Sequence, residues 1–176
     1  MNTDQCTLAG LDAAIDHTCH PYIGSAHEEI AQLTDAAAVG GEQLEAVFTS
    51  KGAELISLIK GSKQYIFRDK SVWEYSAPVL FPICGGLNDG YYTLEGKRYD
   101  LAKHGFSRTA EFEISAQGED HVEFLLRDSD ETYKSYPFHF EFRACYKLER
   151  NTLKVEFITK NLSERDMYFA CGSHEG

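Results

Sequence analysis

Alternation between apolar and polar residues is clearest in the last third of the chain. Between residues 138 and 148 every second side chain is apolar, and residues 152–161 repeat the pattern after a short turn. The apolar members of the two runs are Phe138, Phe140, Phe142, Ala144, Tyr146, Leu148, Leu153, Val155 and Phe157. Because successive side chains of a strand point to opposite faces, this period of two predicts an antiparallel hairpin with one buried and one solvated face.

Shorter runs of β-forming or apolar residues, which also favour strands, occur as far back as residue 42. Candidate strands cover residues 45–50, 53–60, 63–67, 91–94, 97–101 and 165–170. Turn signals separate several of them, for example Gly61-Ser62 and Glu95-Gly96. We therefore expect residues 42–176 to form an all-β domain, built as an antiparallel sandwich or barrel.

The first 41 residues have little β-propensity and predict helix instead. Ser25 suits an N-cap and Glu28 follows it at the spacing of a capping box, while Gly40-Gly41 would end the helix. A shorter helix could form across residues 8–16. We accordingly divide the chain into a helical extension or linker, residues 1–41, and the β domain, residues 42–176.

Acidic charge narrows the choice of partners. The chain has 17 Lys and Arg against 28 Asp and Glu, a net charge of −11, which repels phosphate backbones and anionic lipid. We expect neither nucleic acid nor a membrane as partner, although a local basic pocket could hold a small anion. The five cysteines include no CxxC pair, which favours free thiols in a reducing compartment. With no secretory signal and no membrane-spanning stretch in the sequence, the expected location is the cytoplasm.

Two internal segments carry residues suited to ligand binding. Residues 81–86, FPICGG, combine a proline-fixed bend with two glycines that allow close backbone approach. Residues 103–108, KHGFSR, offer an imidazole at His104 and a guanidinium at Arg108. Such a pair could bind a polyhydroxylated or anionic ligand. Each segment taken alone also fits an ordinary loop or surface turn.

Histidines elsewhere raise two further hypotheses. Residues 171–176, CGSHEG, place His174 in a small-residue turn at a strand end, where side chains often point into clefts. A second cluster comprises His17, Cys19, His20 and His27. Its spacing is not that of standard metal sites, so a solvated helix end is favoured over a metal site. The chain also lacks Gly-rich phosphate loops, GxSxG and HExxH, which disfavours nucleotide chemistry and serine hydrolysis.

Taken in order, four segments resemble the aldose 1-epimerase (galactose mutarotase-like) family. They are residues 52–60, 72–108, 136–161 and 169–176. The likeness is to the bacterial branch with APVLFP and HGF(A/S)R motifs, present here as APVLFP at 77–82 and HGFSR at 104–108. That branch also includes hexose-6-phosphate epimerase-like proteins. The resemblance covers roughly residues 42–176.

The resemblance implies a β-supersandwich about twice as long, so we expect this chain to be an N-terminal fragment. It implies interconversion of the α and β anomers of a hexose, or a hexose phosphate, by acid–base ring opening without a cofactor or metal. By the resemblance, His174 would be the general acid at the ring oxygen. His104 would bind sugar hydroxyls, and Arg108 is the nearest candidate guanidinium for the substrate. The base would be a glutamate downstream of residue 176, so this chain alone is expected to be inactive.

The chain departs from the family pattern at two positions. Gly86 stands where the family often has an arginine that helps to grip the sugar, and Glu175 replaces the usual proline after His174. Because this arginine is missing, a second hypothesis is a non-catalytic carbohydrate-binding or sensing protein on the same scaffold. A purely structural or interaction piece is a third hypothesis.

The substrate and the oligomeric state stay open. Three basic residues near His104 could favour a phosphorylated sugar, or could form a solvated strand face. They are Arg98, Lys103 and Arg108.

Overall fold

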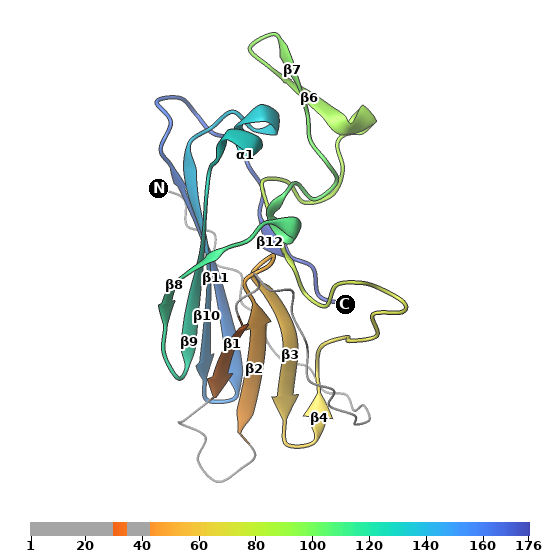
Figure 1. Cartoon of the computed structure of the whole chain (residues 1–176), viewed down its shortest axis with the longest axis vertical. Helices are drawn as coiled ribbons and strands as arrows, with labels where there is room; N and C mark the ends of the chain where they lie inside the picture. The colour runs from red at the N-terminus through yellow and green to blue at the C-terminus, as the bar shows by residue number, and fades with distance from the viewer. Residues whose placement is uncertain (1–29, 35–42) are drawn as a thin grey trace.

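Two four-stranded antiparallel sheets dominate the computed structural model, which describes residues 30–34 and 43–176 (Figure 1). The first sheet has the order β1-β2-β3-β4 and is built from β1 (Ile30–Thr34), β2 (Leu44–Thr49), β3 (Glu54–Lys60) and β4 (Lys63–Gln64). The second has the order β11-β10-β9-β8 and is built from β8 (Glu113–Gln117), β9 (His121–Arg127), β10 (Phe140–Glu149) and β11 (Thr152–Asn161). The expected all-β class is confirmed.

Smaller elements connect and extend the two sheets. They are β5 (Val79–Leu80), η1 (Asn88–Gly90), β6 (Tyr91–Leu94), β7 (Lys97–Asp100), η2 (Ser107–Thr109), α1 (Asp130–Ser135) and β12 (Gly172–Ser173). Strands β6 and β7 form a hairpin that projects beyond the upper ends of the sheets (Figure 1). Strand β12 pairs with β5, although the two are far apart in sequence. Within the described ranges, no helix has the length and apolar character needed to cross a membrane.

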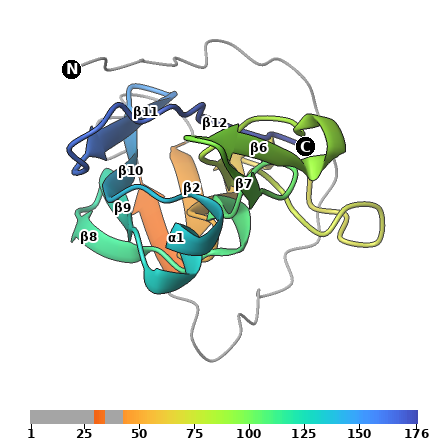
Figure 2. The same ribbon diagram turned by 90° about the horizontal axis from the view of Figure 1, so that it is seen from above.

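The two sheets meet face to face over an aromatic core, and the view from above shows them as two layers (Figure 2). The predicted alternation of β10 is confirmed, because its apolar side chains are buried and those between them are more exposed. Phe48 of β2 packs across the interface on Tyr146 of β10, with ring centroids 4.4 Å apart. The Tyr146 hydroxyl donates a hydrogen bond of 2.9 Å to the carbonyl of Ala53, which ties the two layers together.

The helix expected across residues 25–41 is wrong for residues 30–34, which form β1. Ala31 and Leu33 are fully buried, and β1 pairs antiparallel with β2 along its whole length. Burial of alternate side chains on a sheet edge thus outweighs a local capping signal. The rest of that expected helix, and the one across residues 8–16, lie outside the described residues.

The strand expected across residues 165–170 is also wrong, because these residues have no regular secondary structure. The chain turns directly after β11, where the Asn161 amide donates to the carbonyl of Arg165 over 2.8 Å. Tyr168 and Phe169 are 72% and 40% exposed, so no buried face holds this segment in a sheet. Only Gly172 and Ser173 resume strand pairing.

Candidate active site

The backbone of residues 76–82 forms a spine to which both histidine segments attach. Along one side, residues 170–176 run antiparallel to it. His174 N–H donates to the carbonyl of Pro78 over 3.1 Å, and β12 pairs with β5 beside it. Along the other side, Phe81 forms an isolated parallel bridge with Gly105. The spine therefore brings together two segments separated by about seventy residues of sequence.

Gly105 is required for the second of these attachments. Its φ of +71° is strained for L side chains, and a Cβ here would lie 2.2 Å from the Phe81 carbonyl oxygen. The next turn, η2, is fixed by Ser107, whose buried hydroxyl donates to the carbonyl of Val79 over 2.6 Å. The close approach of backbone to backbone holds the histidine before Gly105 at the edge of the spine.

The imidazole rings of His104 and His174 meet at this point. Their centroids are 5.3 Å apart and the ring planes are nearly perpendicular. His104 is partly buried and His174 is exposed. The spine thus places the two rings side by side, while the chemical roles of both residues stay proposals.

A backbone hydrogen bond determines which ring nitrogen of neutral His104 carries the proton. The Gly85 N–H donates to His104 Nδ1 over 3.0 Å, and the His104 N–H donates to the Gly85 carbonyl over 2.7 Å. Because Nδ1 accepts a hydrogen bond, the neutral ring carries its proton on Nε2. Burial lowers the pKa of His104, and the positive charges of His174, Lys103 and Arg108 lower it further. The lowered pKa favours the neutral ring of His104, whose proton on Nε2 is suited to a donor role.

Two aromatic residues missed by the sequence reasoning adjoin the histidine pair. The indole of Trp73 lies 5.0 Å from the His174 ring and 5.7 Å from the Tyr75 ring, centroid to centroid. Arg108 reaches the same group, with its Cζ atom 5.4 Å from the centroid of Tyr75. A usable signal was present in the sequence, because these aromatics stand at alternate positions just before the APVLFP motif.

The other basic candidates are differently placed. Arg98 lies on the β6–β7 hairpin, where it pairs with Asp100 at 2.6 Å and covers the ring of Tyr91 at 4.0 Å. Gly86 is exposed, and a Cβ at this position would meet the Lys103 side chain at 3.8 Å. Lys103 and Arg108 are therefore the cations that the structure brings to the histidine pair.

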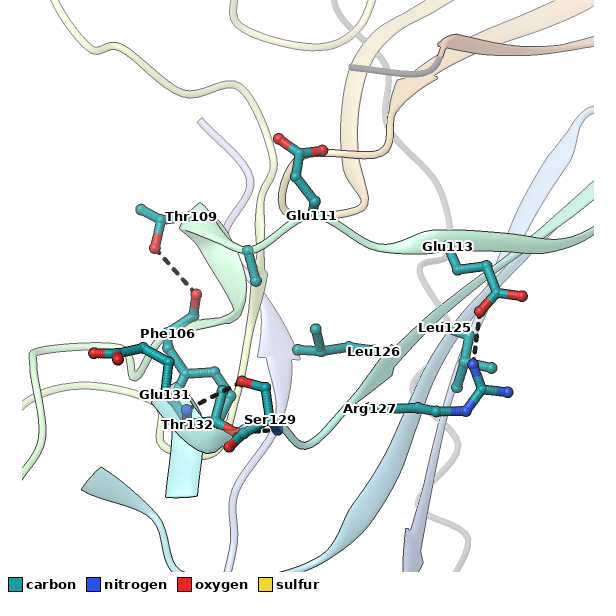
Figure 3. A pocket seen from close by; sticks show the side chains of 11 residues that line it. Phe106, Thr109, Glu111, Glu113, Leu125, Leu126, Arg127, Ser129, Glu131 and Thr132 are labelled. Atoms are coloured by element: carbon teal, nitrogen blue, oxygen red, sulfur yellow. Dashed lines mark hydrogen bonds and ion pairs between the residues drawn. The ribbon is translucent and has the colours of Figure 1, made fainter. Parts of the chain in front are cut away.

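A cavity of about 480 Å³ lies beside η2, and neither His104 nor His174 lines it (Figure 3). Its carboxylates have local partners: Glu113 pairs with Arg127 at 2.6 Å, and Glu111 accepts from a serine hydroxyl at 3.1 Å. We place the candidate site at the two imidazoles rather than in this cavity, because no histidine among the described residues lines the cavity and histidine is the side chain best suited to acid–base work.

Metal chemistry finds no support in the described part of the chain. Within residues 30–34 and 43–176, no three His, Cys, Asp or Glu side chains are grouped so as to hold a metal ion. The histidine- and cysteine-rich cluster at residues 17–27 lies outside the described residues. Cys84 and Cys145 are free thiols.

Comparison with known proteins agrees with the all-β fold. The family model "Aldose 1-epimerase" matches residues 37–175. The chromosomal protein LacX of Lactococcus lactis subsp. lactis is 31% identical over 141 residues, which are 76% of this chain and 47% of that protein. A galactose mutarotase related enzyme from Lactobacillus acidophilus has a TM-score of 0.75 at 36% identity, over 82% of this chain and 48% of that one. A galactose mutarotase-like protein from Lactobacillus casei has a TM-score of 0.74 at 31% identity, over 82% and 49%.

The chain spans about half the length of these relatives. The family match runs continuously through the spine and includes both His104 and His174. The match begins at residue 37, before β2. The chain therefore belongs to the aldose 1-epimerase family.

Proposed function

We propose that the whole protein interconverts the α and β anomers of a hexose by acid–base opening of the sugar ring. His174 is the general acid at the ring oxygen, and His104 donates a hydrogen bond to a sugar hydroxyl. The observation that carries this proposal is the pair of imidazoles, 5.3 Å apart, on one backbone spine. A cofactor is not needed, since one acid and one base suffice for ring opening.

The environments of the two rings support this division of roles. Protonation of His104 at Nδ1 would break its hydrogen bond from Gly85, and burial already lowers its pKa. His104 is therefore suited to a fixed donor role. His174 is exposed and donates its backbone N–H to the spine, which leaves its imidazole accessible to a ligand.

The base is expected in the half of the family that this chain does not span. Glu175 is poorly suited to the role, because it accepts a hydrogen bond from Ser173 and follows His174 directly in an extended segment. Side chains of successive extended residues point to opposite sides. We therefore expect residues 1–176 alone not to accelerate mutarotation.

The substrate is proposed to be a free hexose or a hexose phosphate. Lys103 and Arg108 adjoin the histidine pair and could hold a phosphate, whereas Arg98 already pairs with Asp100. Parallel assays with glucose and glucose 6-phosphate distinguish the two substrates. A preference for the phosphate that disappears in R108Q would assign this residue to the phosphate group.

Polarimetry of freshly dissolved α-D-glucose and α-D-galactose tests the proposed activity. The whole protein should shorten the equilibration time, H174N should abolish the acceleration, and H104N should weaken substrate binding. His121 pairs with Asp120 on the far sheet and provides a matched control, because H121N should leave the rate unchanged. Equal equilibration with and without the wild-type protein would reject an epimerase.

A carbohydrate-binding protein without catalysis is the second candidate, favoured by Gly86 in place of a gripping arginine. Calorimetric titration of the whole protein with the same sugars distinguishes the two. Binding without any effect on the polarimetric rate would establish the alternative. The expected cytoplasmic location stays a prediction.

A further inference from the structure

Trp73 is held in place independently of the histidines. Its backbone N–H donates to the carbonyl of Asp69 over 3.1 Å, in a turn that the Asp69 side chain closes. The carboxylate of Asp69 accepts from the Ser71 N–H over 3.0 Å, and hydrogen bonds from Ser71 lower the pKa of Asp69. The edge of Tyr75 packs against the indole from the other end of the segment. The indole therefore has a fixed position beside the spine.

Residues 174–176 wrap around this indole. Gly176 N–H donates to the carbonyl of Ser76 over 2.8 Å, and a Cβ on Gly176 would lie 2.8 Å from Cζ3 of Trp73. The His174 ring lies 5.0 Å from the indole at an interplanar angle of 41°. An exposed imidazole free of contacts would exchange among its rotamers. Contact with a fixed indole selects the rotamers that keep the ring near His104.

We propose that Trp73 is a positioning residue, which holds the imidazole of His174 beside His104 and stabilises its protonated form. The role of His174 as the acid rests on the proposed function, but the contact itself does not. An imidazolium beside an aromatic ring is attracted by the ring quadrupole. This attraction matters here, because a general acid must carry its proton before the sugar arrives.

Charged groups lie in the same region. Arg108 and Lys103, on the neighbouring 103–108 segment, act on His104, whose pKa they lower. Glu175 is adjacent to His174 in sequence. Trp73 is an uncharged neighbour of His174 whose ring face attracts an imidazolium.

Trp73 is the single tryptophan of the chain, so its fluorescence reports this contact directly. A protonated imidazole in contact with indole quenches its emission. Emission should therefore rise in a single step as the pH is raised and the imidazole loses its proton. H174Q should remove the step, whereas H104Q and the surface control H139Q should retain it. A flat wild-type curve, or an unchanged step in H174Q, would overturn the contact.

Nuclear magnetic resonance of the histidine rings measures the stabilising effect. In W73L the pKa of His174 should fall by about 0.4 to 0.7 pH unit, from the usual strength of an exposed cation–π contact. W73F, which keeps an aromatic face, should recover part of the shift. An unchanged pKa in W73L would overturn the positioning role, and should W73L fail to fold, an unchanged pKa in W73F would do the same.

Polarimetry of the whole protein separates this inference from the proposed function. If the quenching step is present but the protein does not accelerate mutarotation, the function fails and the contact stands. If mutarotation is accelerated and W73L leaves the acidic limb of its pH profile unchanged, the positioning role fails and the function stands.

Discussion

Replacement of Gly105 by alanine should destabilise the fold and disrupt the candidate site together. Two costs add at this position. An L-residue at φ +71° costs about 1–2 kcal/mol, since its Cβ approaches its own carbonyl. The new Cβ would also lie 2.2 Å from Phe81 O and 2.6 Å from Pro82 Cδ. Relief of that overlap requires the two segments to separate, which adds about 1–3 kcal/mol.

The expected loss of unfolding free energy in G105A is thus about 2–5 kcal/mol. Gly96 provides a matched control, because its φ is +78° but a Cβ there would meet nothing within 4 Å. G96A should therefore show the conformational cost alone, about 1–2 kcal/mol. Urea unfolding followed by far-ultraviolet circular dichroism measures both variants against the wild type.

The difference in unfolding free energy between G105A and G96A tests whether Gly105 lies close to Phe81. If G105A loses no more stability than G96A, the contact between Gly105 and Phe81 is not close in solution. The derived position of His104 would then fail as well, because it depends on that contact. If G105A loses the additional 1–3 kcal/mol, roughly as estimated above, the close approach stands.

Three further predictions test the core, the pH response and the thiols. Y146F should cost about 1–2 kcal/mol in urea unfolding, because it leaves the buried carbonyl of Ala53 without its donor; an unchanged midpoint would contradict this bond. The pKa of His104 is lower in the folded protein than its value of about 6.5 in the unfolded chain, so the unfolded chain binds more protons below pH 6.5. The free energy of unfolding should therefore fall as the pH drops from about 6.5 toward the pKa of His104 in the folded protein. H104Q should flatten that fall, and an equal slope in both proteins would refute the assignment. Desolvation raises the pKa of Cys145 to about 12, so iodoacetamide at pH 8 should label the exposed Cys84 well before Cys145; equal labelling by mass spectrometry would argue against it.

The hairpin at residues 138–161 could be predicted because its signal is local and strong. Ten successive pairs between β10 and β11 follow the period of two, and the buried face is the apolar one. Residues 30–34 have no such local signal, and their structure depends on pairing with β2. Ala31 and Leu33 are buried because pairing with β2 brings them into the core between the two sheets. A capping box cannot report that event, since it reads only four neighbouring residues.

The sequence indicated which histidines belong to the candidate site, but not how the backbone brings them together. The HGFSR and GSHEG segments identified His104 and His174 through a family resemblance. Nothing local to either segment indicates that both attach to residues 76–82. The alternate aromatics before the APVLFP motif were a usable signal for Trp73, but its contact with His174 joins residues far apart in the sequence.

The chemical difference between the two histidines arises from their backbones. His104 lies at φ +68°, a left-handed conformation, and exchanges two hydrogen bonds with Gly85, so its ring is engaged before any ligand binds. His174 donates its backbone N–H to the carbonyl of Pro78, and its ring contacts the rings of Trp73 and His104. The lowered pKa of His104 favours its neutral ring, so the two imidazoles can lie 5.3 Å apart without both being charged. The proposed division into a fixed donor and an acid requires this arrangement.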